Sequence, residues 1–497
     1  MKLKKLVIVF TLAALIVIGS GIFMNTAAYD IPSSEESELQ DTVLTIVTRH
    51  DIVITTEFEA RFLETPEAIA LGITDIDFKQ ATTDEGWKTL LQDPSRGIDL
   101  AWGGGPSLFN TMEKWGLLKH IDDVTLKDYI NSQVPDTLGG AAMKSVDESD
   151  NLIWIANAIS SFGFTVNHDF LDTYGLDVPH TWQELADPTY YLGGGVNAIS
   201  MGDPPLTTSN TRIYQIILQA FGWEEGWSIM TRMAANAGIY PGSVDTRAAT
   251  VTGEVGIAMT IDFYGVIANR ENPSCEYIVP EGQSIVNGDP IAMGINVDDE
   301  DAAEAFLEFL FSPEGQAVWL TERLDRLPVN EDAFSTPFGQ DKTYLYGIFN
   351  ATLVTKGIDF NETLATQTLD TTIYYFKKTI SEEHSKLQKV WGEMITQLTD
   401  ATINLATYQK YVEDLGKVGM TLEQAIEWND QYQTDKDFAA LKDSEWRNFA
   451  KNKYNELYYN LTGTYLFTTE SPFLFTPVIF SVLFVATIVY VVRKKRK

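Results

Sequence analysis

Apolar and polar positions alternate along the middle of the chain in two different periods. Short apolar or strictly alternating runs are typical of strands, and the segments between them carry apolar residues at helical spacing. The predicted strands are 43–47, 73–78 and 98–102, and the predicted helices are 52–62, 85–91 and 108–117. Strands that alternate with helices in this way pair in parallel, so the pattern predicts an α/β sheet. A similar block covers 164–290, and apolar helices are predicted at 302–311 and 313–323.

The character of the chain changes to long helices between 363 and 459. Leu387, Trp391, Met394 and Leu398 recur on one face of a predicted helix. Such a stripe must pack against something, either the preceding α/β part or neighbouring helices in a stalk. The pattern leaves both arrangements open.

The C-terminus carries an uncharged run, 473–492, that is followed at once by five basic residues at 493–497. At about 1.5 Å per residue, a helix of this length spans a hydrocarbon core of about 30 Å. A basic cluster beside a span stays on the cytoplasmic side. We therefore predict a membrane anchor with the rest of the chain outside; a buried core helix fits the basic tail poorly.

The N-terminus has the pattern of a secretory signal. Lys2, Lys4 and Lys5 precede an apolar stretch at 6–18, and small residues follow at 26–28. This predicts a signal peptide over 1–28, with an uncleaved anchor as the alternative. Either alternative places the middle of the chain outside the membrane.

The charge and the cysteine content exclude several classes of protein. The net charge of −33 repels nucleic acid and anionic lipid, so neither is an expected partner. Cys275 is the single cysteine, which rules out an internal disulfide and a cysteine-based zinc site. We expect Cys275 to be a buried structural thiol.

Several short motifs follow one another in the order of a known family. They resemble the family 1 extracellular solute-binding proteins of ABC transporters, including the ferric-ion-binding type, with an archaeal-type C-terminal transmembrane anchor. The matching segments are Val178-Pro-His-Thr-Trp-Gln-Glu-Leu-Ala-Asp-Pro-Thr-Tyr190, Met201-Gly-Asp-Pro204, Phe221-Gly-Trp-Glu-Glu-Gly-Trp227, Gly253-Glu-Val-Gly-Ile-Ala258, Ser312-Pro-Glu-Gly-Gln316 and Arg326-Leu-Pro-Val329. The resemblance covers about residues 43–335.

The resemblance implies a two-lobed α/β fold of the periplasmic-binding-protein type (type II), followed here by a helical extension and one transmembrane helix. Ligand would be trapped between the lobes by hinge closure. The expected parts are a signal peptide (1–28), a linker (29–42), lobe 1 (43–160), lobe 2 (161–288), a return to lobe 1 (289–335), a helical extension (336–462), the transmembrane helix (472–492) and a cytoplasmic tail (493–497). The crossing strands are expected near 161–166 and 289–295.

Two polar helix starts are candidates for contact with the ligand. In α/β folds, ligands bind where strands end and helices begin, because helix N-termini offer unpaired N–H groups. On lobe 1 this position holds Gly103, Gly104, Gly105 and Ser107. The counterpart on lobe 2 holds Thr207, Thr208 and Ser209. Ordinary turn and capping roles are the alternative for both.

The ferric-binding relatives suggest a further set of candidates. Arg49 and His50 follow the first strand, where the resemblance places a metal-ligating histidine. The ferric-binding relatives also have a glutamate near the start of the second helix, and Glu85 lies at the matching position. The tandem tyrosines of those relatives correspond here to Asp262-Phe263-Tyr264. Tyr264 and Asp262 offer oxygen ligands, but Phe263 cannot coordinate iron, and this departure argues against a ferric site.

Several solutes therefore remain open. Arg49 and two helix N-termini fit a small anion such as a phosphate ester, phosphonate or carboxylate, whereas Trp102 and Tyr264 suit stacking on a sugar ring. We predict the non-enzymatic, extracellular solute-binding subunit of an ABC importer, with a permease and its ATPase as partners. No cofactor is expected, apart from ferric iron as a possible cargo. The alternatives are a membrane-anchored hydrolase and a cell-surface receptor without a transport role.

Overall fold

The computed structural model describes residues 41–81, 83–354 and 357–467, without the side chain of Thr208. The predicted signal peptide at 1–28 and the predicted span at 472–492 with its basic tail lie outside these residues. Within the described part, no helix has the length and apolar character needed to cross a membrane. The anchor therefore stays a prediction from the sequence.

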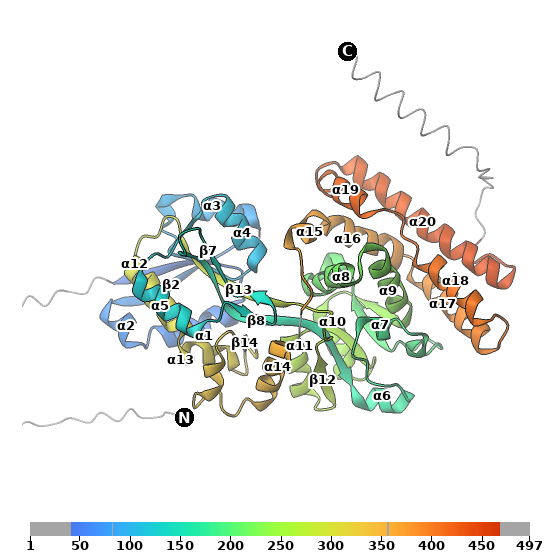
Figure 1. Cartoon of the computed structure of the whole chain (residues 1–497), viewed down its shortest axis with the longest axis horizontal. Coiled ribbons are helices and arrows are strands. Elements are labelled where there is room, and N and C mark those ends of the chain that lie inside the picture. The colour runs from blue at the N-terminus through green and yellow to red at the C-terminus, as the bar shows by residue number, and fades with distance from the viewer. Residues whose placement is uncertain (1–40, 82, 355–356, 468–497) are drawn as a thin grey trace, which may run out of the picture. The chain divides into compact units, whose positions relative to one another are not determined.

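One long strand, β8 (Leu152–Asn167), runs through two halves of a mixed sheet, and all of its residues are buried. Its first part pairs with the strand Val286–Gly294, and its second part pairs with the strands Ile257–Ile261 and Cys275–Ile278. We call the half that contains residues 42–151 and 286–354 lobe 1, and the half that contains residues 168–278 lobe 2. Figure 1 shows β8 passing from one to the other.

Lobe 1 is a mixed sheet with helices packed on it, parallel among its first three strands and antiparallel where the strand Val286–Gly294 joins them. β1 pairs in parallel with β2 and with β3, as the sequence predicted. Its strands are β1 (Thr42–Thr48), β2 (Ile73–Gln80), β3 (Leu100–Trp102), β4 (Leu118–Lys119), β7 (Lys144–Val146), β13 (Val286–Gly294) and β14 (Leu327–Pro328), with β5 (Thr137–Leu138) and β6 (Ala141–Ala142) forming a separate pair. Its helices are α1 (Ile52–Phe62), α2 (Pro66–Ala70), α3 (Asp84–Leu91), α4 (Pro106–Lys114), α5 (Val124–Gln133), α12 (Glu300–Phe311), α13 (Pro313–Ala317) and α14 (Thr343–Val354).

Lobe 2 repeats the same principle around the end of β8. Its other strands are β9 (Ile199–Gly202), β10 (Ala237–Tyr240), β11 (Ile257–Ile261) and β12 (Cys275–Ile278). Its helices are α6 (His168–Tyr174), α7 (Trp182–Leu185), α8 (Thr208–Phe221), α9 (Trp223–Asn236), α10 (Ser243–Val251) and α11 (Asp262–Glu271). The sheet follows the order β10-β9-β11-β8-β13-β3-β1-β2, so β8 and β13 connect the lobes. Cys275 is buried in β12 as a free thiol, as predicted.

The C-terminal helices form one extension. Its helices are α15 (Glu362–Gln367), α16 (Leu369–Phe376), α17 (His384–Thr399), α18 (Leu405–Gly416), α19 (Leu422–Thr434) and α20 (Lys436–Thr462), with a π-helical turn at Lys377–Ser381. Leu387, Trp391 and Met394 are buried in a hydrophobic cluster that also contains Ile213 and Met230 of lobe 2. Figure 1 shows these helices beside α8 and α9. The extension thus docks on lobe 2 and shares its core.

Helix α14 falls within the helical extension predicted from the sequence (336–462), but it packs on lobe 1. Its buried Leu345, Ile348 and Phe349 belong to the lobe 1 cluster, and Thr352 contacts Ser161 of β8 at 3.5 Å. The helical part that follows lobe 1 therefore divides in two, and α14 supports the crossing strands.

Candidate functional site

The end of β1 places Arg49 and His50 on lobe 1. Arg49 donates from Nη2 to Asp84 at 2.7 Å, and its guanidinium lies 5.9 Å from the centre of the Trp87 ring. The His50 side chain is buried, and its ring stands edge-on to Trp102 with 4.5 Å between the centroids. Both predicted residues therefore already have partners within lobe 1.

The buried His50 belongs to a charge cluster with Asp289 of β13 and Arg326, whose side chains are largely shielded from solvent. Oδ2 of Asp289 lies 2.9 Å from Nη2 of Arg326 and 3.8 Å from Nε2 of His50. Burial lowers the pKa of His50 to about 4, more than Asp289 raises it. Burial by itself would raise the pKa of Asp289, but His50, Arg326 and a backbone N–H outweigh it and hold that pKa below its ordinary value. His50 is therefore neutral beside an ion pair of Asp289 and Arg326.

The glycine run after β3 is fixed by the same cluster. The N–H of Gly103 donates to the carbonyl of Pro290 at 2.8 Å, and the N–H of Gly104 donates to Oδ1 of Asp289 at 3.1 Å. Gly103 has φ 84°, and a Cβ there would lie 2.7 Å from Nε2 of His50. The glycines thus let the backbone pass close to His50, which is a packing reason for their presence.

Trp102 is a core residue in this structure. Its side chain is completely buried and its indole N–H donates to Asn157 at 3.0 Å. The proposed stacking of Trp102 on a sugar ring is therefore not available, because other aromatic rings surround it.

The start of α4 is different, because no side chain caps it. Its N-cap is Gly105, with φ 84°, and Pro106 occupies the first turn. Ser107, in the same turn, donates its hydroxyl to Oε2 of Glu362 at 2.6 Å. A carboxylate of the extension therefore bonds the predicted ligand-contacting serine.

On lobe 2, three hydroxyl groups meet at a cavity of about 490 Å³. Oγ of Ser243 lies 2.5 Å from Oγ1 of Thr207 and 2.6 Å from Oγ of Ser209. Thr207 caps α8, whereas no side chain caps α10, which begins at Ser243 after Gly242. The first turn of α10 therefore keeps N–H groups without a side-chain acceptor beside these hydroxyls.

Tyr264 lines the same cavity. Burial raises the pKa of Tyr264 although Arg247, whose guanidinium is 6.0 Å from the ring centre, lowers it. The phenol is therefore protonated near neutral pH and can donate a hydrogen bond. The structure thus places three of the candidate residues, Thr207, Ser209 and Tyr264, at one cavity. The side chain of Thr208 is outside the described part.

Asp262 does not share this position. The sequence suggested it as an oxygen ligand, but it begins helix α11, where its Oδ1 accepts the N–H of Phe263. Its Oδ2 accepts the N–H of Ser161 at 2.6 Å, and burial raises its pKa to about 6. Asp262 is buried and fixes β8 to α11, so it holds the crossing strand instead of facing the cavity.

The three metal-ligand candidates lie in separate surroundings. His50 is buried against Trp102 and Asp289, Glu85 is a solvent-exposed side chain 3.9 Å from Lys88, and Tyr264 lines the lobe 2 cavity. In the described residues, no group of three or more histidine, cysteine, aspartate or glutamate side chains could hold a metal ion. In the described structure these three residues therefore do not converge on one point.

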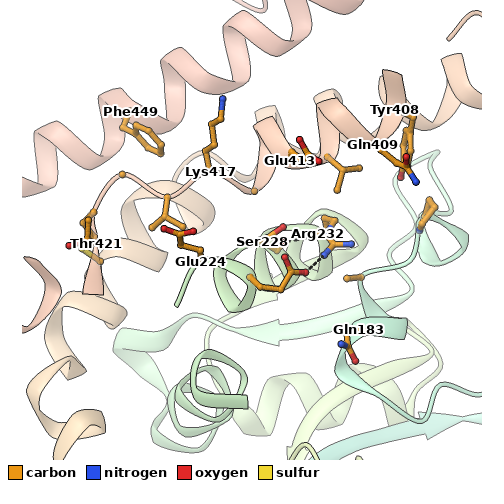
Figure 2. A pocket seen from close by; sticks show the side chains of 18 of the residues that line it. Gln183, Glu224, Ser228, Arg232, Tyr408, Gln409, Glu413, Lys417, Thr421 and Phe449 are labelled. Carbon is orange, nitrogen blue, oxygen red and sulfur yellow. Dashed lines mark hydrogen bonds and ion pairs between the residues drawn. The ribbon is translucent and has the colours of Figure 1, made fainter. Parts of the chain in front are cut away.

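A larger cavity, about 1170 Å³, lies between lobe 2 and the extension. Figure 2 shows Ser228 and Arg232 of α9 on one side and Glu413 and Lys417 at the end of α18 on the other. Arg232 is already paired with Glu225 at 3.2 Å. We assign the solute site to the smaller lobe 2 cavity, because that one lies where strands end and helices begin.

Four residues at the site were not singled out as contacts from the sequence: Ser243, Asp289, Arg326 and Glu362. Arg326 belongs to the Arg326-Leu-Pro-Val329 motif and Asp289 to the predicted return strand. Both segments were identified from the sequence, so both residues could have been named as candidates. Ser243 follows a Pro-Gly turn at the start of a helix, the same signal that marked Ser107. Glu362 had no local signal, because it lies 255 positions from its partner Ser107.

Comparisons with known proteins agree on the fold. The phosphoglycerate transport regulatory protein of Salmonella typhimurium is 26% identical over 215 residues, which cover 43% of this chain and 51% of that protein. The chain thus spans about half the length of the curated relatives it matches.

Solved structures extend the likeness in fold to most of the chain. A putative extracellular solute-binding protein from Bordetella parapertussis has a TM-score of 0.53 at 15% identity, covering 68% of this chain and 98% of its own. An ABC transporter protein from Clostridium perfringens has a TM-score of 0.50 at 18% identity, covering 66% and 97%. The spermidine/putrescine substrate-binding protein of Streptococcus pneumoniae has a TM-score of 0.50 at 18% identity, covering 68% and 99%.

The family model described as bacterial extracellular solute-binding protein matches residues 60–345, more than half of the 497 residues. This range includes lobe 2 with its cavity, most of lobe 1, β8 and β13, and Asp289 and Arg326 of the charge cluster. The chain therefore belongs to the bacterial extracellular solute-binding proteins, and it is, as the sequence predicted, a binding protein and not an enzyme.

Proposed function

We propose that the chain captures a small anionic solute between its lobes and delivers it to the permease and ATPase of an ABC importer. The observation that carries this proposal is the lobe 2 cavity, where Thr207, Ser209, Ser243 and Tyr264 meet the uncapped start of α10. A helix N-terminus favours a negative group, because its N–H groups and its dipole both point there.

The chemistry of these groups favours a phosphorylated or carboxylated solute. Hydroxyls and backbone N–H groups are hydrogen-bond donors to phosphate and carboxylate oxygens, and the phenol of Tyr264 adds another donor. The name of the Salmonella relative refers to phosphoglycerate transport, and phosphoglycerate carries both kinds of anionic group. It is therefore the first probe to use.

Closure of the lobes would complete the site. The lobe 2 cavity is lined by lobe 2 residues, so the lobe 1 contacts to the solute would form when the lobes approach. β8 and β13 connect the lobes and are the segments about which this hinge motion would occur.

The solute can be identified directly. Full-length protein purified under native conditions would be denatured, and the released small molecules analysed by mass spectrometry together with a metal analysis. Calorimetric titration of stripped protein with phosphoglycerate and inorganic phosphate, and with spermidine as a cationic control, tests the charge preference. We expect binding of an anion; binding of spermidine alone, or stoichiometric iron in the native sample, would refute the proposal.

We also propose that the protein works at the outer face of the cell membrane, held by the predicted span at 472–492. The support is the basic tail at 493–497 and the family's extracellular role. Protease treatment of intact cells should remove the lobes from a membrane fraction. Protection of the lobes, or their presence in the soluble fraction, would contradict this placement.

A further inference from the structure

The segment that leads from lobe 1 into the extension is fastened to lobe 2. The N–H of Ile358 donates to the carbonyl of Ser284 at 2.9 Å. Asn361 and Gln219 of α8 exchange two hydrogen bonds, at 2.7 Å and 3.0 Å. We call residues 357–362 the strap. Together with Pro106 and Trp154 of lobe 1 it lines a cavity of about 270 Å³.

Glu362, at the end of the strap, connects both lobes through one oxygen atom. Its Oε2 accepts from Oγ of Ser107 at 2.6 Å and from Nη1 of Arg212 at 2.9 Å. Ser107 lies in the first turn of α4 on lobe 1, and Arg212 lies on α8 of lobe 2. The side chains of Arg212 and Glu362 are only 23% and 26% exposed.

These donors are the ones that an anionic ligand would use. A guanidinium and a hydroxyl that converge on one oxygen are a common way to hold carboxylate or phosphate. Arg212 follows Ser209 by three positions on α8, so it lies on the same side of the helix as a residue of the lobe 2 cavity. The start of α4 has no capping side chain, and Glu362 supplies the negative group there.

We propose that Ser107 and Arg212 form an anion-binding subsite that bridges the lobes, and that Glu362 of the extension occupies it until an anionic solute displaces it. This inference rests on the proposed function, since it assigns one anionic group of the solute to this subsite. The extension thus competes with the solute. An anion occupies the subsite only if it binds there more favourably than the carboxylate of Glu362.

Competition predicts that replacing Glu362 strengthens the binding of the solute, which a purely structural contact does not predict. An intramolecular group that fills a site reduces apparent affinity to the fraction of molecules in which the site is free. If Glu362 fills the subsite in about nine of ten molecules, its removal tightens binding by about tenfold. A glutamate that merely braces the lobes would leave affinity unchanged or weaken it when replaced.

Four variants are compared with the wild type in calorimetric titrations of the full chain with phosphoglycerate and inorganic phosphate. Glu362→Gln keeps the size of the side chain and removes its charge, and we expect about tenfold tighter binding. Arg212→Gln should weaken binding by about tenfold, and the double variant should bind as weakly as Arg212→Gln. Glu427→Gln, an exposed carboxylate on α19, is the matched control and should not change affinity.

A second readout follows the strap itself. When phosphoglycerate saturates the wild-type protein, amide hydrogen exchange of residues 357–368 should become faster while the first turn of α10 becomes slower. In Glu362→Gln the strap should exchange fast before ligand is added. Circular dichroism of each variant confirms that it is folded.

The outcomes separate the two proposals. Equal or weaker binding by Glu362→Gln, with measurable binding by the wild type, would overturn the subsite inference and leave the proposed function standing. Absence of anion binding by all of the proteins would refute the anionic solute and the subsite together. Strap exchange that slows with ligand would likewise overturn the displacement of Glu362.

Discussion

The two walls of the candidate site differ in how far the chain itself satisfies their polar groups. On lobe 1, Asp289 accepts from Gly104 and pairs with Arg326, and Ser107 donates to the extension. On lobe 2, the hydroxyls around Ser243 bond one another at the edge of an open cavity. Most polar groups of the lobe 1 wall are thus paired within the chain, and among the described residues the exceptions are Nε of Arg49, Nε2 of His50 and Nε of Arg326. The lobe 2 wall instead keeps N–H groups at the start of α10 that no side chain accepts.

This difference separates folding from binding. A polar group that is already paired in a buried cluster contributes to stability, and its loss leaves its partner without compensation. A group at a cavity wall has few partners within the chain, so it contributes little to the free energy of unfolding and acts mainly when a ligand binds. Substitutions on lobe 1 should therefore reduce the free energy of unfolding, and substitutions on lobe 2 should mainly reduce affinity.

The largest effect is expected at Asp289. In Asp289→Asn the guanidinium of Arg326, whose side chain is only 15% exposed, loses its counter-charge, and we expect the free energy of unfolding to fall by about 3 kcal/mol. Asp245→Asn, at the lobe 2 cavity, should change it by less than about 0.5 kcal/mol because its side chain is exposed. Urea unfolding followed by fluorescence measures both. Similar losses in the two variants would contradict the contrast between the walls.

The pH dependence of stability should show the lobes acting in opposite directions. Burial lowers the pKa of His50 from 6.5 to about 4, so acidification through that window protonates the unfolded chain first and costs about 3 kcal/mol. Burial raises the pKa of Asp262 from 3.8 to about 6, so acidification from pH 6 to 3.8 protonates the folded chain first and adds about 3 kcal/mol. The two contributions nearly cancel in the wild type.

Variants separate these contributions. Asp262→Asn leaves the His50 effect alone, and its stability should fall by about 3 kcal/mol between pH 6.5 and 4 relative to the wild-type profile. His50→Asn should show the reverse, a relative gain over the same range. Urea titrations at several pH values measure both profiles. Parallel profiles for all three proteins would mean that neither group titrates as its burial implies.

The fold was largely predictable from local patterns. The predicted strands at 43–47 and 98–102 correspond to β1 and β3, since short apolar runs bounded by polar loops carry that information locally. The helix predicted over 313–323 ends as α13 at Ala317, and a 3₁₀ turn follows with Trp319 and Leu320 buried. The apolar face of α17 showed that this helix packs, but not that its partner is lobe 2, because a stripe does not specify what covers it.

The site was predictable only where one segment contains the signal. Thr207 and Ser209, which line the lobe 2 cavity, were named as candidates because the sequence pattern identifies hydroxyl residues at the start of a helix. Asp289 was not, because its bond to Gly104 joins positions 185 residues apart. Asp262 looked like a ligand by alignment with a tyrosine motif, whereas its actual role depends on the long-range contact with Ser161.

A smaller effect compares two glycines with the same backbone angle. Gly103 and Gly140 both have φ 84°, but a Cβ would lie 2.7 Å from His50 at Gly103 and would meet nothing within 4 Å at Gly140. Gly140→Ala should therefore cost about 1 kcal/mol from backbone strain alone. Gly103→Ala should cost about 2 kcal/mol more, because His50 must move. Equal costs, measured by urea unfolding, would show that lobe 1 is less tightly packed than the contacts indicate.

The smallest effect on stability, and the clearest on binding, is expected at Tyr264. Tyr264→Phe removes one hydrogen-bond donor from the lobe 2 cavity and keeps the ring, so unfolding should change by less than about 0.5 kcal/mol. Loss of one hydrogen bond to the solute, about 1 kcal/mol, weakens affinity by about fivefold. Tyr174→Phe on α6, whose ring is 43% exposed, is the matched control and should leave both quantities unchanged. Calorimetry with phosphoglycerate and urea unfolding measure the pair. If Tyr264→Phe instead loses stability without losing affinity, the lobe 2 wall is a structural surface like the lobe 1 wall, and the separation of binding from folding fails.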